Sequence, residues 1–184
     1  PHLHYEDYKA GSAKLDACME LVHGALDGGH HILLFSQFTG MLDIIGKRLA
    51  KEDIGFLKLT GASSKESRAK MVAQFQAGEV PVFLISLKAG GVGLNLTAAD
   101  VVIHYDPWWN VAAQDQATDR AHRIGQQHTV TVYKLIAKDT IEERIMQMQE
   151  SKRDLVNSVL GGDGISSALF TREDVLALLG GDGR

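Results

Sequence analysis

Short runs of apolar residues recur along this chain, and longer segments with helical spacing separate them. The runs are Ile32–Phe35, Phe56–Leu59, Val82–Ile85, Val101–Tyr105 and Val130–Ile136. Each run is nearly continuous in hydrophobicity, which is typical of strands covered on both faces, as in a parallel sheet flanked by helices. The pattern therefore predicts five parallel strands with both faces buried.

Apolar residues three or four positions apart mark the helical segments between these runs. Ser12 is suited to cap the first helix. Ser63 with Glu66 matches the S-x-x-E capping box, and Thr140 opens a second box at the start of a long last helix. The apolar helical positions are Leu15, Met19, Val22 and Leu26; Met41, Ile45 and Leu49; Met71, Val72 and Phe75; and Ile141, Ile145, Met148, Leu155 and Val159. Strands that alternate with helices predict an α/β fold with a doubly wound parallel sheet.

A glycine-rich segment near the C-terminus ends this pattern. Residues 161–164 read Gly-Gly-Asp-Gly, which is typical of a flexible connector, and a short amphipathic helix is predicted over Thr171–Leu179. We expect a linker over 1–11, a folded domain over 12–160, and a flexible tail with that short helix over 161–184. Because the first residue is Pro1 and not methionine, we expect the chain to be part of a longer protein.

The composition narrows the functional classes only in part. At 184 residues the chain can form one substantial core, and its one cysteine, Cys18, excludes an internal disulfide framework and a CxxC zinc site. No apolar run approaches the ~20 residues that a membrane-spanning helix needs. Nineteen Lys and Arg against 23 Asp and Glu leave a net charge of -4. A protein that holds nucleic acid through its overall field is normally basic, so any phosphate contact is expected to be local.

Three regions that follow predicted strands differ from scaffolding. Ligands of open parallel sheets bind beyond the carboxyl ends of the strands, so these regions are candidate site segments. They are Ser36-Gln37-Phe38-Thr39, the glycine loop over 86–95, and Asp106-Pro107-Trp108-Trp109-Asn110 with the segment 115–126 that it leads into.

The glycine loop allows more than one interpretation. Gly90, Gly91 and Gly93 let the backbone approach a ligand closely and point N–H groups at an anion. A dinucleotide fingerprint G-x-G-x-x-G is disfavoured, because Leu96 stands at its third glycine and the loop follows a middle strand. Glycines that serve only a tight turn stay an alternative.

Two arginines form the sharpest candidate site. Arg120 and Arg123 are three positions apart and project from one face of a helix, and Gln116 joins that face four positions earlier. Forked guanidinium donors suit the oxygens of a phosphate group. The alternative is a solvated face on which Asp115 and Asp119 pair with the arginines.

The remaining motifs bear on nucleic acid, metals and nucleophiles. We expect one of Trp108 and Trp109 to pack in the core, whereas an exposed indole would suit contact with a nucleic-acid strand. The eight histidines have no partners at metal-ligand spacing, so no metal site is predicted. No nucleophile elbow occurs, and the P-loop G-x-x-x-x-G-K-[ST] is absent, so the chain has a phosphate-recognising arginine pair without a phosphate-holding loop.

Several long segments resemble the C-terminal half of Swi/Snf-type helicase-like ATPases. The segments are SAKLDACMELV at 12–22, ILLFSQFTGMLDII at 32–45, LTGASSKESR at 59–68, FLISLKAGGVGLNLTAADVVIHYDPWWN at 83–110 and DQATDRAHRIGQ at 115–126. The likeness runs from about Ser12 to about Val159. It implies a RecA-like fold and the second lobe of a double-stranded DNA translocase.

The resemblance implies a nucleotide site shared between two lobes. ATP and Mg²⁺ would be held mainly by an N-terminal lobe, from which residues 1–11 would lead into this chain. Arg120 and Arg123 would be arginine fingers that stabilise charge on the transferring γ-phosphoryl group. We therefore expect the chain by itself not to hydrolyse ATP. Further positions at the nucleotide-facing edge would be Gln116, Gly91 and Gly93.

The resemblance also implies contacts to the DNA backbone. Hydroxyls, backbone N–H groups and one lysine would position a strand without reading its sequence, which agrees with a net charge of -4. The implied positions are Ser36, Gln37, Thr60, Gly61, Ser86, Lys88, Gly90 and Trp109. The helix over 140–159 looks like the brace with which the family returns towards its first lobe. Val111 departs from the proline that many relatives have after DPWWN, which is expected to change only local stiffness.

Two functions of different classes stay open. The first is a lobe of a DNA-dependent ATPase. The second is a motor-derived, non-catalytic module that binds nucleic acid or regulates, against which the intact arginine pair weighs. The expected partners are the N-terminal lobe and double-stranded DNA, with a larger nucleoprotein complex as a further candidate and no membrane. The expected location is intracellular, cytoplasmic in a bacterium and nuclear in a eukaryote.

Overall fold

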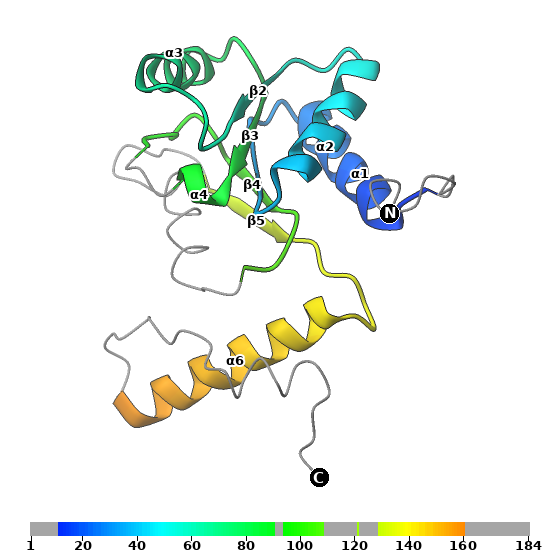
Figure 1. The fold of residues 1–184 in the computed structure, drawn as a ribbon, viewed down its shortest axis with the longest axis vertical. Coiled ribbons are helices and arrows are strands. Elements are labelled where there is room, and N and C mark those ends of the chain that lie inside the picture. The colour runs from blue at the N-terminus through cyan, green and yellow to red at the C-terminus, as the bar shows by residue number, and fades with distance from the viewer. Residues whose placement is uncertain (1–10, 91–93, 109–120, 122–128, 161–184) are drawn as a thin grey trace.

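A computed structural model describes residues 11–90, 94–108, 121 and 129–160. Its centre is a five-stranded parallel sheet in the order β2-β3-β1-β4-β5 (Figure 1). The strands are β1 (Ile32–Ser36), β2 (Phe56–Leu59), β3 (Val82–Ser86), β4 (Val101–His104) and β5 (Thr131–Lys134). The helices are α1 (Ala13–Asp27), α2 (Thr39–Lys51), α3 (Lys65–Gln76), α4 (Leu87–Gly90) and α6 (Ile141–Leu160). The predicted α/β class with a parallel sheet is confirmed.

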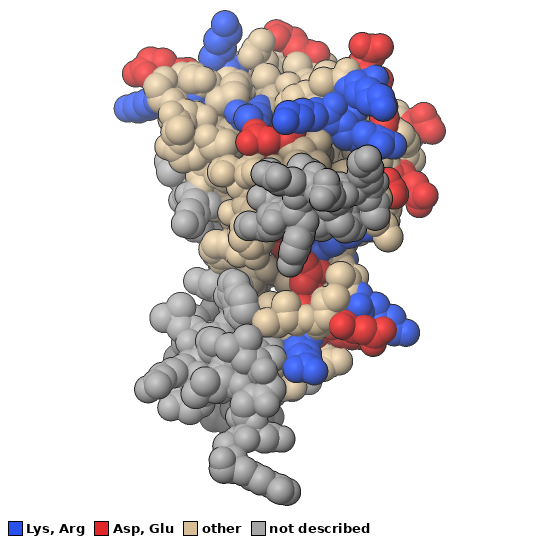
Figure 2. Space-filling model, turned by 45° about the vertical axis from the view of Figure 1, so that its right-hand side comes forward, with Lys and Arg blue, Asp and Glu red and all other residues tan. Residues whose placement is uncertain are grey.

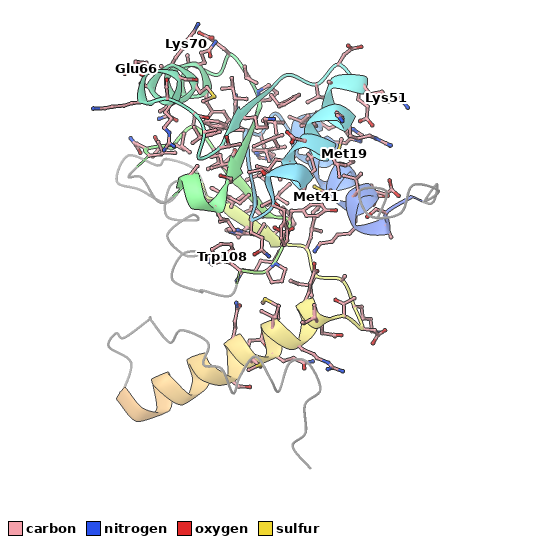
Figure 3. The ribbon with its side chains drawn as sticks, viewed as in Figure 1. Met19, Met41, Lys51, Glu66, Lys70 and Trp108 are labelled. Atoms are coloured by element: carbon pink, nitrogen blue, oxygen red, sulfur yellow. The ribbon has the colours of Figure 1, made fainter. Side chains whose placement is uncertain are left out.

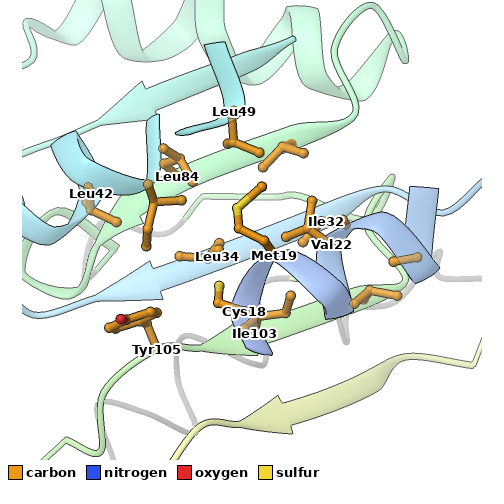
Figure 4. Packing of buried hydrophobic residues seen from close by; sticks show 14 residues of the cluster. Cys18, Met19, Val22, Ile32, Leu34, Leu42, Leu49, Leu84, Ile103 and Tyr105 are labelled. Carbon is orange, nitrogen blue, oxygen red and sulfur yellow. The ribbon is translucent and has the colours of Figure 1, made fainter. Parts of the chain in front are cut away.

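Successive residues of the central strands point to opposite faces and build two cores. In β1, Leu34 belongs to the core with Met19 and Val22 of α1, which Figure 4 shows from close by. Its neighbour Leu33 belongs to the second core, with Phe75 of α3. Every residue of β1, β3 and β4 is buried. Both faces of these three strands are therefore covered, as their continuous apolar runs predict.

The direction of the connections explains which helix covers which face. The chain leaves β1 through α2 towards β2, and then runs back through α3 to β3 and through α4 to β4. Right-handed crossovers that run in opposite directions place their helices on opposite faces. Accordingly, α2 packs in the first core, and α3 and α4 pack in the second. The connection that leaves β1 runs in the opposite direction to the connection that leaves its neighbour β3, so the sheet changes its winding beside β1.

Two of the predicted strands are not covered on both faces. All four residues of β5 are exposed, and in β2 only Leu59 is buried. Both strands stand at the ends of the sheet order, where a strand has a neighbour on one side only. The apolar runs therefore predicted the strands correctly, but the inference of complete cover was wrong for these two.

One helix cap differs from the prediction by one residue. Ser12 caps α1 as predicted. The N-cap of α3 is Ser64, whose side chain accepts from Ser67 N–H at 3.2 Å, and not Ser63. The Ser63 hydroxyl instead accepts a hydrogen bond from Thr60 N–H at 3.2 Å. It closes the turn after β2, which is why it is not available to the helix.

The long helix α6 packs on the rest of the structure through its first half. Thr140 accepts from Glu142 N–H at 3.2 Å at the helix start, and the side chains of Ile145 and Gln149 are buried. No described helix, α6 included, combines the length and apolar character needed to cross a membrane. The predicted tail over 161–184 and, apart from Gly11, the predicted linker over 1–11 lie outside the described residues.

Candidate nucleic-acid interface

The predicted contact turns collect at one edge of the sheet. Because the strands are parallel, the turn after β2, the start of α4 after β3 and the turn after β1 follow one another in strand order along their carboxyl ends. Ser36 and Ser86 are register partners on neighbouring strands. With adjacent strands about 4.8 Å apart, the edge from β2 to β4 spans roughly 14 Å.

The middle of this edge lies where the sheet changes its winding. The helix α2, which follows β1, packs in the first core, and the helix α4, which follows the neighbouring strand β3, packs in the second. Crevices at such a change of winding are where open α/β sheets bind their ligands. The turn after β1, with Ser36 and Gln37, occupies this position.

A buried carboxylate ties the turn after β1 to the segment after β4. Asp106 Oδ2 accepts hydrogen bonds from the Ser36 hydroxyl and from Gln37 N–H, both at 2.8 Å. The Ser36 hydroxyl oxygen in turn accepts from Phe38 N–H at 3.1 Å. Burial raises the pKa of Asp106, and the bonds from Gln37 and Ser36 oppose that rise.

The same network decides which groups of this turn face solvent. The Ser36 side chain is fully buried, so its hydroxyl acts within the protein. Gln37 is half-buried and its Nε2 donates to the Pro107 carbonyl at 3.4 Å. Phe38 is 59% exposed, the most exposed large apolar side chain of the described residues. The turn therefore presents Gln37 and Phe38 outwards on a fixed backbone.

The turn after β2 is held by an arginine. Arg68 Nε donates to the Ser63 carbonyl at 3.0 Å, and Nη2 donates to the carbonyls of Gly61 at 3.3 Å and Thr60 at 3.5 Å. A Cβ added to Gly61 would meet no atom within 4 Å. The space over Gly61 is thus open, and three carbonyls of the turn accept hydrogen bonds from the guanidinium of Arg68.

The third contact segment begins at the end of β3. Ser86 is buried, and its hydroxyl accepts from Ala89 N–H at 3.4 Å. Lys88 and Gly90 belong to the short helix α4, so their backbone lies at the carboxyl edge. Gly91 and Gly93, predicted at the nucleotide-facing side, lie outside the described residues.

Trp108 joins the sheet edge to α6. Its side chain is partly buried and packs against the second core, as expected for one of the paired tryptophans. Its carbonyl accepts a hydrogen bond from Gln149 Nε2 of α6. Figure 3 shows Trp108 at the side of the sheet that faces α6. The predicted DNA contact Trp109 lies outside the described residues.

The predicted nucleotide-facing residues of the segment 115–126 also lie outside the described part: Gln116, Arg120 and Arg123. Within this segment the structure describes Ala121, which is fully buried in the second core. The roles of the two arginines and of Gln116 remain predictions.

Charge is mixed on the face of the molecule that Figure 2 shows. On the face drawn in Figure 2, Lys and Arg side chains stand among Asp and Glu side chains and do not form a field of one sign. The described residues contain no group of three or more His, Cys, Asp or Glu that could hold a metal ion. Cys18 is buried, and burial raises its pKa to about 12, so its thiol stays protonated at neutral pH.

Sequence reasoning missed three residues that build the interface from behind. Asp106 and Arg68 hold the turns after β1 and β2, and Gln149 holds the segment after β4; Asp106 stands in a candidate site segment, but none of the three is a predicted contact residue. Asp106 stands directly after a predicted strand, and Arg68 stands inside a segment that carries the family resemblance, so both had a signal. Gln149 had none, because its partner is 41 residues away in the chain.

A parallel sheet wound on both faces, with polar turns at its carboxyl edge, is a doubly wound α/β lobe, and its similarity to solved SWI2/SNF2-type ATPase structures makes it RecA-like. Residues 13–125 match the family model of the helicase conserved C-terminal domain. The chain belongs to this family, in the Swi/Snf-type branch that its relatives represent.

These relatives are much longer than the chain. It is 46% identical over 168 residues to a protein of Mycoplasma pneumoniae named as an uncharacterized ATP-dependent helicase, covering 91% of this chain and 16% of that protein. It is 46% identical over 165 residues to the chromatin-remodeling ATPase INO80 of Cryptococcus neoformans, covering 89% and 9%. The SWI2/SNF2 ATPase core of Sulfolobus solfataricus, solved in complex with dsDNA, has a TM-score of 0.71 and 38% identity, covering 87% of this chain and 34% of that one.

Proposed function

We propose that the chain is the second motor lobe of an ATP-dependent double-stranded DNA translocase. The observation that carries this proposal is the alignment of three predicted DNA-contact turns along one edge of the sheet. Relatives that are named ATP-dependent helicases and remodelling ATPases, and a similar ATPase core solved with dsDNA, support it.

The proposed DNA contacts follow from the chemistry of the edge. The three turns after β2, β3 and β1 span two strand spacings, roughly 10 Å, which matches about three nucleotides of one strand at 3.4 Å each along the helix axis. Backbone N–H groups, Gln37, Thr60 and Lys88 would contact phosphate oxygens, and open space over Gly61 lets the backbone of a DNA strand approach. Ser36 and Ser86 would support these turns from inside, because their hydroxyls bond within the chain.

The proposed nucleotide chemistry is divided between two lobes. Arg120 and Arg123 would reach the γ-phosphoryl group across the interface, with Gln116, Gly91 and Gly93 on the same edge. ATP supplies the phosphoryl group, and Mg²⁺ neutralises charge on it. The described residues contain no acidic cluster for that ion, so the proposal assigns Mg²⁺ and most of the ATP contacts to the N-terminal lobe. An intracellular site of action, in the nucleus of a eukaryote or the cytoplasm of a bacterium, is part of the proposal.

The test compares this chain with the full-length protein that carries it. The full-length protein is expected to hydrolyse ATP faster when duplex DNA is added, whereas this chain alone is expected to show no turnover. This chain is expected to bind a fluorescent duplex with an affinity that falls as salt rises. Turnover by the chain alone would contradict the division between lobes. DNA binding without any ATPase activity in the full-length protein would favour a non-catalytic binding module instead.

A further inference from the structure

In the segment after β4, two parts of the structure hold the same piece of chain near the proposed DNA contacts. Asp106 accepts hydrogen bonds from the turn after β1, and Trp108, two residues later, accepts one from α6. We propose that Asp106 is a positioning residue for DNA engagement, whose carboxylate holds the Ser36–Phe38 turn in the shape that meets the duplex. This inference rests on the proposed function.

The geometry of the carboxylate supports a role in shaping the turn. One oxygen, Asp106 Oδ2, takes both the Ser36 hydroxyl and Gln37 N–H at 2.8 Å. Through the Ser36 hydroxyl, which accepts from Phe38 N–H and lies 3.3 Å from the Phe38 carbonyl, the same anchor fixes three consecutive residues. A turn that is already fixed loses less conformational freedom when it binds a ligand.

The burial of the network separates positioning from direct contact. Asp106 is 5% exposed and Ser36 is fully buried, so neither side chain faces the solvent from which DNA approaches. A negative carboxylate would also repel phosphate if it touched it directly. Asp106 therefore acts through the half-buried Gln37 and the exposed Phe38, which follow the buried Ser36 in the turn.

A second set of contacts ties the same segment to α6. Gln37 Nε2 donates to the Pro107 carbonyl at 3.4 Å, and Gln149 Nε2 donates to the Trp108 carbonyl. Gln149 is buried although it is polar, which costs stability unless its hydrogen bonds are made. The segment 106–108 is thus hydrogen-bonded both to the turn after β1 and to α6.

The opposite end of β4 provides a matched control. Asp100 stands directly before β4 and also bridges to the chain at β1, with Oδ1 accepting from His31 N–H at 3.1 Å and Oδ2 lying 2.7 Å from His30 Nδ1. It joins the same two strands through one backbone N–H and one side chain, here the His30 ring in place of a hydroxyl, but at the amino-terminal edge, away from the proposed DNA contacts. A purely structural role would make the two aspartates equivalent.

The experiment measures the duplex DNA concentration that gives half-maximal ATPase stimulation in the full-length protein. Asp106→Ala and Asp100→Ala are expected to lower the melting temperature similarly. Only Asp106→Ala is expected to raise the half-maximal DNA concentration, by about tenfold, as expected for a lost anchoring bond. Asp106→Asn is expected to stay within about twofold of wild type, because its Oδ1 can accept both hydrogen bonds without the charge.

Each outcome decides a separate point. Equal DNA dependence in Asp106→Ala and Asp100→Ala overturns the positioning role. An Asp106→Asn variant as impaired as Asp106→Ala overturns it too, because charge and not shape would then matter. If Asp106→Ala does not fold, Ser36→Ala, which removes one donor and keeps the bond from Gln37 N–H, takes its place with a smaller expected rise of about threefold, and no rise overturns the role. A wild-type protein that DNA does not stimulate would instead reject the proposed function.

Discussion

Lys14 at the start of α1 and Glu142 at the start of α6 form an ion pair of 2.5 Å across 128 positions of sequence. The Lys14 ammonium also lies 5.1 Å from the centre of the Tyr105 ring. Tyr105 directly precedes Asp106 in the sequence. Both members of the pair are mostly buried, with 16% and 24% of their side chains exposed. The pair therefore connects α6 to the part of the structure that carries the interface.

This pair is expected to contribute measurably to stability. A double-mutant cycle with Lys14→Met and Glu142→Gln should give a coupling free energy of about 1 kcal/mol, near the upper end for ion pairs that solvent still reaches. The control is the pair of Lys58 and Asp43, which is 40% and 51% exposed and should couple by less than about 0.5 kcal/mol. Urea unfolding measures both. Equal coupling free energies in the two cycles would show that the burial of Lys14 and Glu142 does not strengthen their ion pair.

Arg68 is expected to support the turn after β2 and not merely to add positive charge. Arg68→Ala removes hydrogen bonds to three carbonyls, so it should lower the free energy of unfolding by about 1–2 kcal/mol and weaken duplex binding several-fold. Lys70, at the outer side of the same helix in Figure 3, is the charge-matched control. Lys70→Ala should leave stability unchanged and weaken binding less. If Arg68→Ala and Lys70→Ala lose the same affinity for duplex DNA in a fluorescence titration, Arg68 contributes only its positive charge and not support of the turn.

Phe38 is expected to lower the free energy of unfolding while it contributes to DNA binding. It stands at the N-cap of α2 without a side-chain cap bond, at a position where serine is favoured, and it is 59% exposed. Phe38→Ser should therefore raise the free energy of unfolding by about 0.5–1 kcal/mol. We expect the same variant to need more duplex DNA for half-maximal ATPase stimulation. A more stable variant with unchanged DNA dependence would remove Phe38 from the interface.

His104 is expected to make the fold sensitive to acid. Burial lowers its pKa from 6.5 to about 4, with a smaller effect of Lys134. Between these values the unfolded chain binds a proton that the folded protein does not, so stability falls as the pH drops from about 6.5 to about 4, by about 3 kcal/mol in all. The raised pKa of Asp106 changes stability with pH in the opposite direction, because the folded protein holds that proton more tightly. This contribution is present in the wild type and in a His104 variant alike, so it does not affect a comparison of the two.

The measurement for His104 is urea unfolding at pH 7.5, 6 and 5. His104→Phe keeps a ring against Phe35, on which the imidazole stacks at 5.5 Å. This variant should lose much less stability between pH 7.5 and pH 5 than the wild type. Parallel pH profiles in the two proteins would show that His104 is not the acid-sensitive group.

Arg123 is expected to act on turnover and not on nucleotide affinity. In the full-length protein, Arg123→Ala should bind ATP within about twofold of wild type and lose about 10³-fold in turnover, the effect of removing an arginine finger. Arg48→Ala, at an exposed arginine in the last turn of α2, is the control and should turn over normally. Titration with a fluorescent nucleotide and a phosphate-release assay separate the two effects. A large loss of affinity with unchanged turnover would reassign Arg123 to ATP binding.

The position of a residue relative to the predicted strands is enough to place it at the edge of the sheet, but not to say which way its side chain faces. A residue directly after a buried strand of a parallel sheet must lie at the carboxyl edge, so Ser36, Thr60 and Ser86 could be gathered there from their positions alone. Whether a hydroxyl faces the ligand or the interior is not a local property. Ser36 and Ser86 can be buried because their hydroxyls have hydrogen-bond partners inside the protein. The partner of Ser36 is Asp106, and the partner of Ser86 is the N–H of Ala89 in the following helix.

Hydrophobic periodicity by itself determined the strands, most of the helices and the parallel sheet, because burial of one face or two leaves its own repeat in the chain. The order β2-β3-β1-β4-β5 and the cover of each strand were decided only by packing, which left β5 exposed at the end of the sheet. The same holds for the pairing of Asp106 with Ser36, 70 residues apart. A hydrogen bond between distant elements depends on which strands become neighbours and in which register, and that is a property of the whole folded chain.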